Sequence, residues 1–169
     1  MLGARRRGGP ARGRAGARRG IAAAALVTAP STDETIRLAL GHRTWAVVGC
    51  SPDPRRDSHR IAALLGSRGY RVLPVNPTAD EVLGLPCVPS LGDLPPGERV
   101  DVVDLFRRSD HVGAHVEEAI TIGAKVVWMQ LGVVDEAAAE RARTAGLSVV
   151  MDRCPAIELP RLGIEGPSA

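Results

Sequence analysis

Small residues follow the first predicted strand, at a point where a protein with a parallel sheet would bind an anion. The segment 48–58 reads V-G-C-S-P-D-P-R-R-D-S. Gly49 lets the backbone approach a ligand closely. The amides of Cys50 and Ser51, together with the Ser51 hydroxyl, are donors for phosphate oxygens. The segment is therefore predicted to form a phosphate-binding loop.

Two arginines in the same segment favour that interpretation. Arg55 and Arg56 carry guanidinium groups whose fork of donors matches phosphate. Ser58 is predicted to begin a helix, and the N-terminus of a helix attracts anions. The segment contains neither the G-x-G-x-x-G dinucleotide fingerprint nor the Gly-Lys-Ser/Thr of a Walker A loop. The alternative is an ordinary tight turn with solvated arginines, and the pattern favours the anion site.

Three more predicted strands end in residues that would lie at the same edge of a sheet. The turn 75–77 is stiff and could lie against a ribose or a base, or could simply end its strand. Two arginines end the third strand, and a Gln-Leu-Gly turn ends the fourth. Ligands of open α/β sheets bind at the carboxyl ends of the strands, so we expect an electropositive cleft there. The residues expected to contact a ligand are Gly49, Cys50, Ser51, Arg55, Arg56, Val75, Asn76, Pro77, Phe106, Arg107, Arg108, Gln130, Leu131 and Gly132.

A cysteine near the C-terminus is a candidate redox residue. Cys154 follows Asp152 and Arg153, and a neighbouring arginine can lower the pKa of a thiol and make it reactive. The favoured alternative is a buried structural cysteine, with Arg153 paired to Asp152 or Glu158. The chain has three cysteines at wide spacing, which predicts neither a disulfide framework nor a CxxC zinc site.

Patterns for metal binding and catalysis are weak. His111 and His115 are four residues apart on a predicted helix, but no third ligand or glutamate base is in register with them. A surface helix is the favoured interpretation, and no metal site is predicted. The chain has no nucleophile elbow and no credible Ser-His-Asp order. We expect no catalytic residues, and whether the protein is an enzyme stays open.

The elements that would position these residues alternate along the chain. Apolar runs of strand length lack polar alternation, which is typical of strands buried on both faces, and amphipathic helices separate them. This alternation predicts an α/β fold with a doubly wound, mainly parallel sheet and helices on both faces. Residues 81–94 are expected to add one short strand and a helical turn. The strands are predicted at 44–49, 70–77, 99–106, 124–132 and 147–151, and the helices begin at a Ser31 capping box, at Ser58, at Ser109 and at Asp135.

The positive charge of the chain is confined to its start. The 169 residues, enough for one compact domain, carry a net charge of +3. Seven arginines and no acid precede residue 31, so residues 31–169 carry −4. Residues 1–30 are rich in Arg, Gly and Ala without apolar periodicity, and are predicted to form a disordered basic arm. Residues 31–169 are expected to form the folded domain.

Three interpretations of the basic arm stay open. It could bind an acidic partner. It could be an export signal, because Arg18-Arg19 precedes the apolar run IAAAALVTA. It could also come from a start codon assigned too early, with Val27 as the true start. No apolar run is long enough to span a bilayer, so the cytoplasm is the expected location.

Nucleic acid is not an expected partner. Only 2% of the residues are aromatic, too few for a platform on which single-stranded bases stack. The predicted folded part is also acidic, which disfavours binding to a polyanion. The charge that matters for function is expected to be the local group of arginines at the strand ends.

The chain from 32 to 162 resembles a known family. The run GCSPDPRRDSHRIAALLGSRGYRVLPVNPTADEVLGLPCVPSL is followed in order by VDVVDLFRR, EEAITIGAKVVWMQLGV, AGLSVVMDRC and IE. These segments resemble the small bacterial and archaeal CoA-binding proteins. Those proteins are stand-alone relatives of the N-terminal CoA-binding Rossmann domain of succinate-CoA ligase alpha subunits. The resemblance implies a Rossmann-like sheet of five strands.

The resemblance also implies a placement for coenzyme A. The family holds the 3′,5′-ADP and pyrophosphate part across the first loop and the next strand ends. By that likeness, the phosphates would contact Gly49, Cys50, Ser51 and Arg56, and the adenosine would lie between Val75, Asn76 and Pro77. Phe106, Arg107 and Arg108 would line the cleft, and Gln130, Leu131 and Gly132 would approach the pantetheine.

Two positions depart from the family pattern. Some members have apolar or proline residues where this chain has Arg107 and Arg108, and two cations there fit extra phosphate charge or a different anionic ligand. Ala156 stands where some relatives carry lysine, which argues against lysine-based chemistry. The phosphorylatable histidine of the ligases belongs to a second domain, and no counterpart of it is expected among these residues.

The expected function is binding of coenzyme A or an acyl-CoA without catalysis. One alternative is a subunit or accessory domain of a CoA-transferring or ligase-type enzyme. The other is a regulatory domain that binds NAD(P) or another nucleotide. The expected partner is the small CoA ligand, with no membrane contact, and a homodimer or a hetero-partner stays open. If Cys154 is reactive, it would exchange with the CoA thiol or sense redox state.

Overall fold

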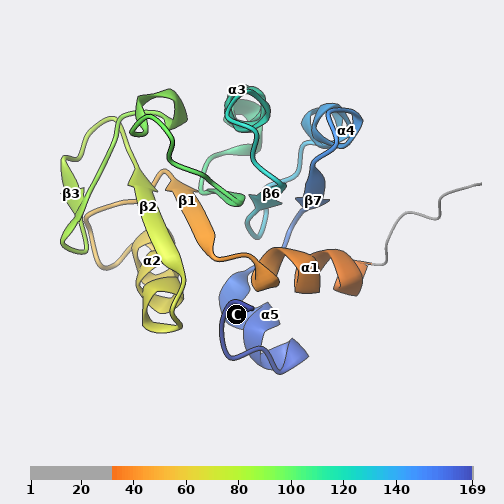
Figure 1. The fold of residues 1–169 in the computed structure, drawn as a ribbon, viewed down its shortest axis with the longest axis horizontal. Coiled ribbons are helices and arrows are strands. Elements are labelled where there is room, and N and C mark those ends of the chain that lie inside the picture. The colour runs from red at the N-terminus through yellow and green to blue at the C-terminus, as the bar shows by residue number, and fades with distance from the viewer. Residues whose placement is uncertain (1–31, 169) are drawn as a thin grey trace, which may run out of the picture.

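The computed structural model describes residues 32–168, so the predicted basic arm and the Ser31 cap lie outside the described residues. Within them, five strands form one sheet in the order β2-β1-β5-β6-β7 (Figure 1). Every pairing in this sheet is parallel. The strands are β1 (Thr44–Val48), β2 (Arg71–Val75), β5 (Val102–Leu105), β6 (Val126–Met129) and β7 (Ser148–Val150).

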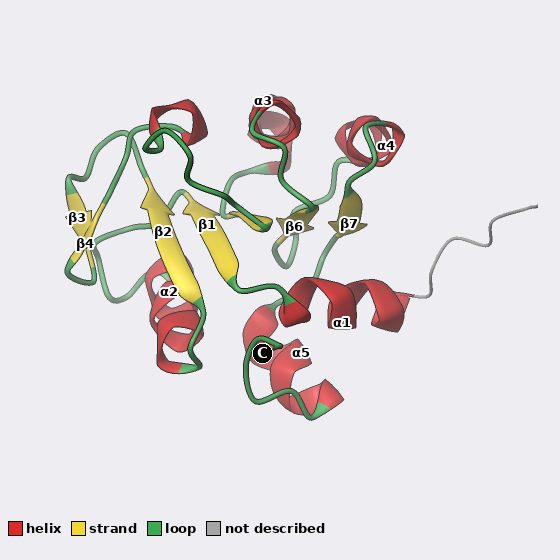
Figure 2. Cartoon of the chain, in the orientation of Figure 1, coloured by secondary structure: helices red, strands yellow, loops and turns green. Residues whose placement is uncertain are grey.

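Helices cover both faces of the sheet (Figure 2). The α3–α4 side carries α3 (Ser109–Thr121) and α4 (Glu136–Thr144), and the α2–α5 side carries α1 (Thr32–Gly41), α2 (Asp57–Ser67) and α5 (Pro155–Leu162). This arrangement confirms the predicted α/β fold with a doubly wound parallel sheet. No helix in residues 32–168 has the length and apolar character to cross a membrane.

The order in which the strands are added to the sheet reverses direction between β1 and β5. Val88 makes an isolated parallel bridge to Val75 on the outer edge of β2. Asn76 N donates to Val88 O at 2.9 Å, and Val88 N donates to Pro74 O at 3.2 Å. Val88 therefore occupies the place of a further strand, which completes the order 3-2-1-4-5-6 of the Rossmann fold.

The segment between β2 and β5 differs in part from the sequence prediction. Instead of one short strand, it forms an antiparallel hairpin of β3 (Glu81–Val82) and β4 (Leu85–Pro86). Leu83 has a φ of 57° and Gly84 a φ of 72°, a pair of positive values that suits a tight hairpin turn. The expected helical turn is present as the 3₁₀ helix η1 (Leu91–Asp93).

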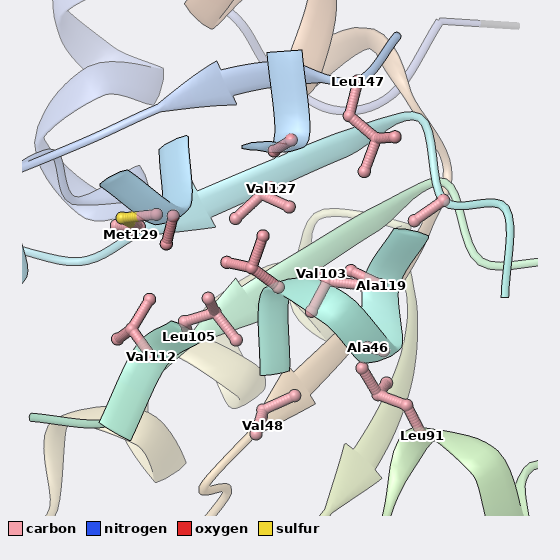
Figure 3. Close-up of a cluster of buried hydrophobic side chains, with 14 of the residues drawn as sticks. Ala46, Val48, Leu91, Val103, Leu105, Val112, Ala119, Val127, Met129 and Leu147 are labelled. Atoms are coloured by element: carbon pink, nitrogen blue, oxygen red, sulfur yellow. The ribbon is translucent and has the colours of Figure 1, made fainter. Parts of the chain in front are cut away.

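Two apolar clusters fill the two sides of the sheet. The cluster on the α3–α4 side consists of Val, Ala, Leu and Met residues, among them Val103, Leu105 and Met129 (Figure 3). The cluster on the α2–α5 side contains or contacts all four aromatic residues of the chain. The ring centroids of Trp45 and Trp128 lie 5.5 Å apart. Because strand side chains alternate between faces, each strand contributes to both clusters.

Helix α2 begins differently from the prediction. It starts one residue earlier than expected, with Arg56 at the N-cap and no side-chain cap. Ser58 lies inside the first turn of α2. Its hydroxyl accepts a hydrogen bond from Ser51 N at 3.0 Å. The serine thus fixes the preceding loop and does not cap its own helix.

The starts of α3 and α5 also differ. Arg108 is the N-cap of α3, whereas Ser109 was predicted to cap it. The Ser109 hydroxyl instead accepts from Val134 N at 3.0 Å and joins the start of α3 to the loop between β6 and α4. The C-terminal segment, for which no helix was predicted, forms α5, with Pro155 in its first turn and Gly163 in the left-handed conformation after its end.

Candidate functional site

A cleft of about 870 Å³ opens at the carboxyl ends of β1, β5 and β6 and extends along α2 to the start of α5. Cys154 lines it, as do eight of the fourteen residues that the sequence predicted to contact a ligand. These eight are Gly49, Ser51, Arg56, Phe106, Arg107, Arg108, Gln130 and Leu131. The remaining lining residues are Asp57, Ser58, Arg60, Ile61, Leu64, Val133 and Ala156.

Gly49 sets the shape of the cleft where β1 ends. Its φ is 82°, and a Cβ atom at this position would lie only 2.5 Å from the carbonyl oxygen of Phe106. Its amide donates to Val75 O at 2.8 Å. A glycine is therefore required for the chain leaving β1 to pass this close to the chain leaving β5.

Three helices begin at the cleft without a side-chain cap. Their N-cap residues are Arg56 for α2, Arg108 for α3 and Cys154 for α5, and all three line the cleft. In α4, by contrast, the Asp135 side chain caps the first turn by accepting from Ala138 N. First-turn amides without a cap carry partial positive charge. The cleft therefore collects the positive ends of three helices.

Two of the arginines at the cleft have no carboxylate partner in the described part of the chain: Arg56 and Arg107. The Nε atom of Arg107 is buried and lacks a hydrogen-bond partner among the described residues. Arg108 pairs with Asp110 at 3.1 Å, and Arg60 pairs with Asp57. Unpaired guanidinium groups beside open helix N-termini suit an anionic ligand.

The comparisons with known proteins agree with this geometry. A family model described as CoA binding domain matches residues 43–160. The chain belongs to the CoA-binding domain family. It is 38% identical over 125 residues to the uncharacterized protein YneT of Bacillus subtilis (strain 168), with 74% of this chain and 91% of YneT covered.

Two solved structures are also similar to this chain. A hypothetical protein from Pyrococcus horikoshii OT3 matches with a TM-score of 0.73 and 38% identity, covering 80% of this chain and 94% of that one. The dinucleotide forming acetyl-coenzyme A synthetase 1 of Ca. Korarchaeum cryptofilum, in complex with phosphate and ADP, matches with a TM-score of 0.59 and 31% identity. That match covers 69% of this chain and 27% of the synthetase.

The loop between β1 and α2 is built differently from the expectation. The amides of Cys50 and Ser51 were expected to face phosphate, but Cys50 N donates to Val75 O at 3.3 Å and Ser51 N donates to Ser58 Oγ at 3.0 Å. The loop holds its own shape with these amides. The donors left for an anion are the arginines and the first-turn amides of the helices.

Six of the fourteen predicted residues lie outside the lining of the cleft. Arg55 is exposed and pairs with Asp53 at 2.9 Å, so it is directed to its own loop. The Asn76 side chain donates to Cys50 O at 2.8 Å and accepts from Thr78, so it ties β2 to the first loop. The others are Cys50 and Val75, which are buried, and Pro77 and Gly132, which are exposed.

Two features of the site were not predicted from the sequence: the α2 wall of the cleft and a carboxyl beneath it. Ile61 and Leu64 pack against the apolar cluster on the α2–α5 side, and both also line the cleft. Asp104 interrupts the apolar run of β5, and a charged residue in a strand buried on both faces was a usable signal. Asp104 is fully buried, and Gln130 Nε2 donates to its Oδ1 at 2.6 Å.

The environment of Cys154 favours a structural role. Burial raises the pKa of its thiol, the opposite of the activation that a neighbouring arginine was expected to give. Arg153 instead donates to Asp152 O at 2.8 Å and lies 3.7 Å from Glu158. Burial also raises the pKa of Cys50, to about 12. Both thiols are therefore protonated and poorly nucleophilic near neutral pH.

Proposed function

We propose that this protein binds coenzyme A or an acyl-CoA in the cleft and catalyses no reaction of its own. The observation that carries the proposal is the convergence of three uncapped helix N-termini and two unpaired arginines on one cleft. Such a set of donors suits a ligand with several phosphate groups. Membership of the CoA-binding domain family supports the same ligand.

The lining of the cleft divides by charge in the way that this ligand requires. Arg56, Arg107 and Arg108 gather where the first loop meets α2 and α3, and the phosphates belong there. The lining residues that follow β6 or begin α5 are uncharged, namely Gln130, Leu131, Val133, Cys154 and Ala156, and they form what we call the uncharged end. The pantetheine and any acyl group belong at that end, because they carry no charge.

A titration with matched arginine variants tests the proposal. Calorimetry compares CoA, acetyl-CoA, NAD, NADP and ATP, and we expect binding of the CoA species. Arg56→Gln should weaken CoA binding about tenfold, because it removes a charge-assisted hydrogen bond. Arg55→Gln is the matched control and should bind as the natural chain does, since Arg55 pairs with Asp53 outside the cleft. No response to any CoA species, with a clear response to NAD or NADP, would overturn the proposal.

A second candidate is an accessory domain of a CoA-transferring or ligase-type enzyme. It is favoured by the 31% identity to about a quarter of the Korarchaeum acetyl-coenzyme A synthetase, in which the matching region is part of a longer chain. This candidate predicts a stable complex with a second protein in native lysate. Such a complex would also have to show acyl-CoA turnover that neither component shows alone.

A further inference from the structure

Asp104 is a carboxyl group without any exposed surface, on β5 beneath the cleft. Its Oδ1 lies 2.6 Å from the side-chain amide of Gln130. Its Oδ2 is buried and has no hydrogen-bond partner among the described residues. An ionised carboxylate with an unpaired buried oxygen is costly. Burial accordingly raises the pKa of Asp104 to about 7, so both charge states are accessible near neutral pH.

Gln130 connects this carboxyl to the cleft. It follows β6, lines the uncharged end of the cleft and is 5% exposed. One end of its amide contacts Asp104, which leaves the other end for a ligand. The two ends have the same shape but opposite chemistry, because the NH₂ group donates and the oxygen accepts. The end that faces the ligand therefore depends on what Asp104 requires.

We propose that Asp104 and Gln130 form a proton-controlled selector for the sulfur end of the ligand, an inference that rests on the proposed function. When Asp104 is protonated, it donates to the Gln130 oxygen, and the NH₂ group faces the cleft. That group donates to the carbonyl oxygen of a thioester. When Asp104 is ionised, it accepts from the NH₂ group, and the Gln130 oxygen faces the cleft. That oxygen repels the carbonyl oxygen of a thioester, because both are acceptors, and it accepts a hydrogen bond from a free thiol.

The sulfur end is the part of the ligand that reaches Gln130. The cationic end of the cleft holds the phosphates, and the pantetheine extends away from them towards β6 and α5. The thioester or thiol ends this arm, and Gln130 is the one amide side chain among the residues that line the cleft. The other polar side chain described at this end is the Cys154 thiol, which is only a weak donor and a weak acceptor.

Asp104 is the group in its surroundings that we expect to change its charge near neutral pH. Helix α1 turns only uncharged residues to the sheet. The thiols of Cys50 and Cys154 stay protonated, since burial raises the pKa of both. Glu158 of α5 is held in ion pairs with Arg153 and Arg161, and Asp57 of α2 is held in an ion pair with Arg60. Arg107 stays charged, and His59 contacts Ser51 O at 3.0 Å.

The test compares acetyl-CoA with free CoA across pH. The dissociation constant of each ligand is measured by calorimetry between about pH 6 and pH 8, below the range in which a free thiol ionises. The phosphates are common to both ligands, so their titration cancels in the ratio. The ratio of the acetyl-CoA constant to the CoA constant should rise about threefold to tenfold over this range, the worth of one hydrogen bond.

Two variants separate the selector from other causes. Asp104→Asn cannot change charge, so its ratio should not depend on pH. Histidine also titrates near neutral pH, so His59→Gln is the matched control and should keep the dependence of the natural chain. A flat ratio in the natural chain, or a rising ratio in Asp104→Asn, would overturn the inference while leaving CoA binding intact. Failure of both ligands to bind would instead overturn the proposed function.

Discussion

The two sides of the sheet are built from the same five strands but differ in the residues that they bury. The α3–α4 side holds an apolar cluster of Val, Ala, Leu and Met residues. The α2–α5 side holds all four aromatic residues and, in the described part of the chain, every buried polar or charged residue: Thr35, Ser58, Asp104, Gln130 and Glu158. Alternation along a strand allows this division, because neighbouring residues point to opposite sides.

The division teaches where this fold can place polar chemistry. On β5, Val103 and Leu105 pack into the apolar cluster, while Asp104 between them lies under the cleft. A strand can thus contribute stability with one set of residues and a ligand site with the other. Stability should be most sensitive to the α3–α4 side, and ligand binding most sensitive to the α2–α5 side.

Truncating the apolar cluster should have the largest effect on stability. Leu105 is fully buried there (Figure 3). Leu105→Ala should lower the free energy of unfolding by about 2–5 kcal/mol, because it removes buried methyl groups and leaves a cavity. Urea unfolding measures the loss, and the folded variant should bind CoA nearly as the natural chain does.

Two further truncations make that comparison sharper. Ile61 packs on the α2–α5 side and lines the cleft, so Ile61→Ala should weaken binding more than Leu105→Ala while costing less stability. Leu38, which is 49% exposed, is the surface control, and Leu38→Ala should change stability by less than about 0.5 kcal/mol. Equal binding losses in the two core variants would contradict the division between the two sides.

The buried carboxyl of the α2–α5 side should make stability depend on pH. The pKa of Asp104 is about 7 in the folded chain, well above that of an unfolded aspartate. The folded state binds the proton of Asp104 more tightly than the unfolded state does. The protonated carboxyl therefore contributes fully to the free energy of unfolding at acid pH, and this contribution is lost as the pH rises through about 7. The natural chain should therefore lose free energy of unfolding relative to Asp104→Asn as the pH rises. Between pH 4 and pH 8 the difference should change by up to about 4 kcal/mol in favour of the variant.

That pH effect is measured as a difference between two proteins. Other carboxyls act in the opposite direction, since hydrogen bonds and ion pairs lower the pKa of Asp33 and Asp101. Their contribution is common to both proteins and cancels in the difference. Parallel stability curves for the natural chain and Asp104→Asn would show that Asp104 does not titrate in this range.

The sequence predicted the fold well because the fold depends on a periodic pattern. The apolar runs and the alternating helices are repeated many times along the chain, and one misplaced residue changes little. The site was predicted less completely because it depends on single hydrogen bonds between distant segments. Nothing in the local sequence shows that Ser58 bonds back to Ser51 N, or that Asn76 bonds Cys50 O across 26 residues.

A pair of glycine variants tests the close approach beneath the cleft. Gly49 and Gly69 have similar φ values, 82° and 87°, but only Gly49 faces a nearby backbone atom, Phe106 O. A Cβ at Gly69 meets nothing within 4 Å. Both Gly→Ala variants should be strained by about 1 kcal/mol or more, and Gly49→Ala should lose about 1–2 kcal/mol beyond that. Only Gly49→Ala should also weaken CoA binding, because β1 and β5 must separate. Equal losses in both would show that φ alone matters.

The smallest effect contrasts two helix starts, that of α4, which is capped, and that of α2, which lies at the cleft without a cap. On the α3–α4 side, Asp135 caps α4, and Asp135→Ala should cost about 1 kcal/mol. On the α2–α5 side, Arg56 already has the extended backbone of an N-cap residue, with φ −83° and ψ 143°, but provides no cap. Arg56→Ser should therefore be about 0.5–1 kcal/mol more stable than Arg56→Gln in thermal unfolding.

The same serine should bind CoA more weakly than the glutamine, because its hydroxyl takes a first-turn amide that the ligand phosphate would otherwise use. Stability and affinity then change in opposite directions at one position. If Arg56→Ser gains stability without losing affinity relative to Arg56→Gln, the open first turn of α2 is not part of the anion site. In that case the arginines alone would account for the binding, and α2 would differ from α4 only by lacking a cap.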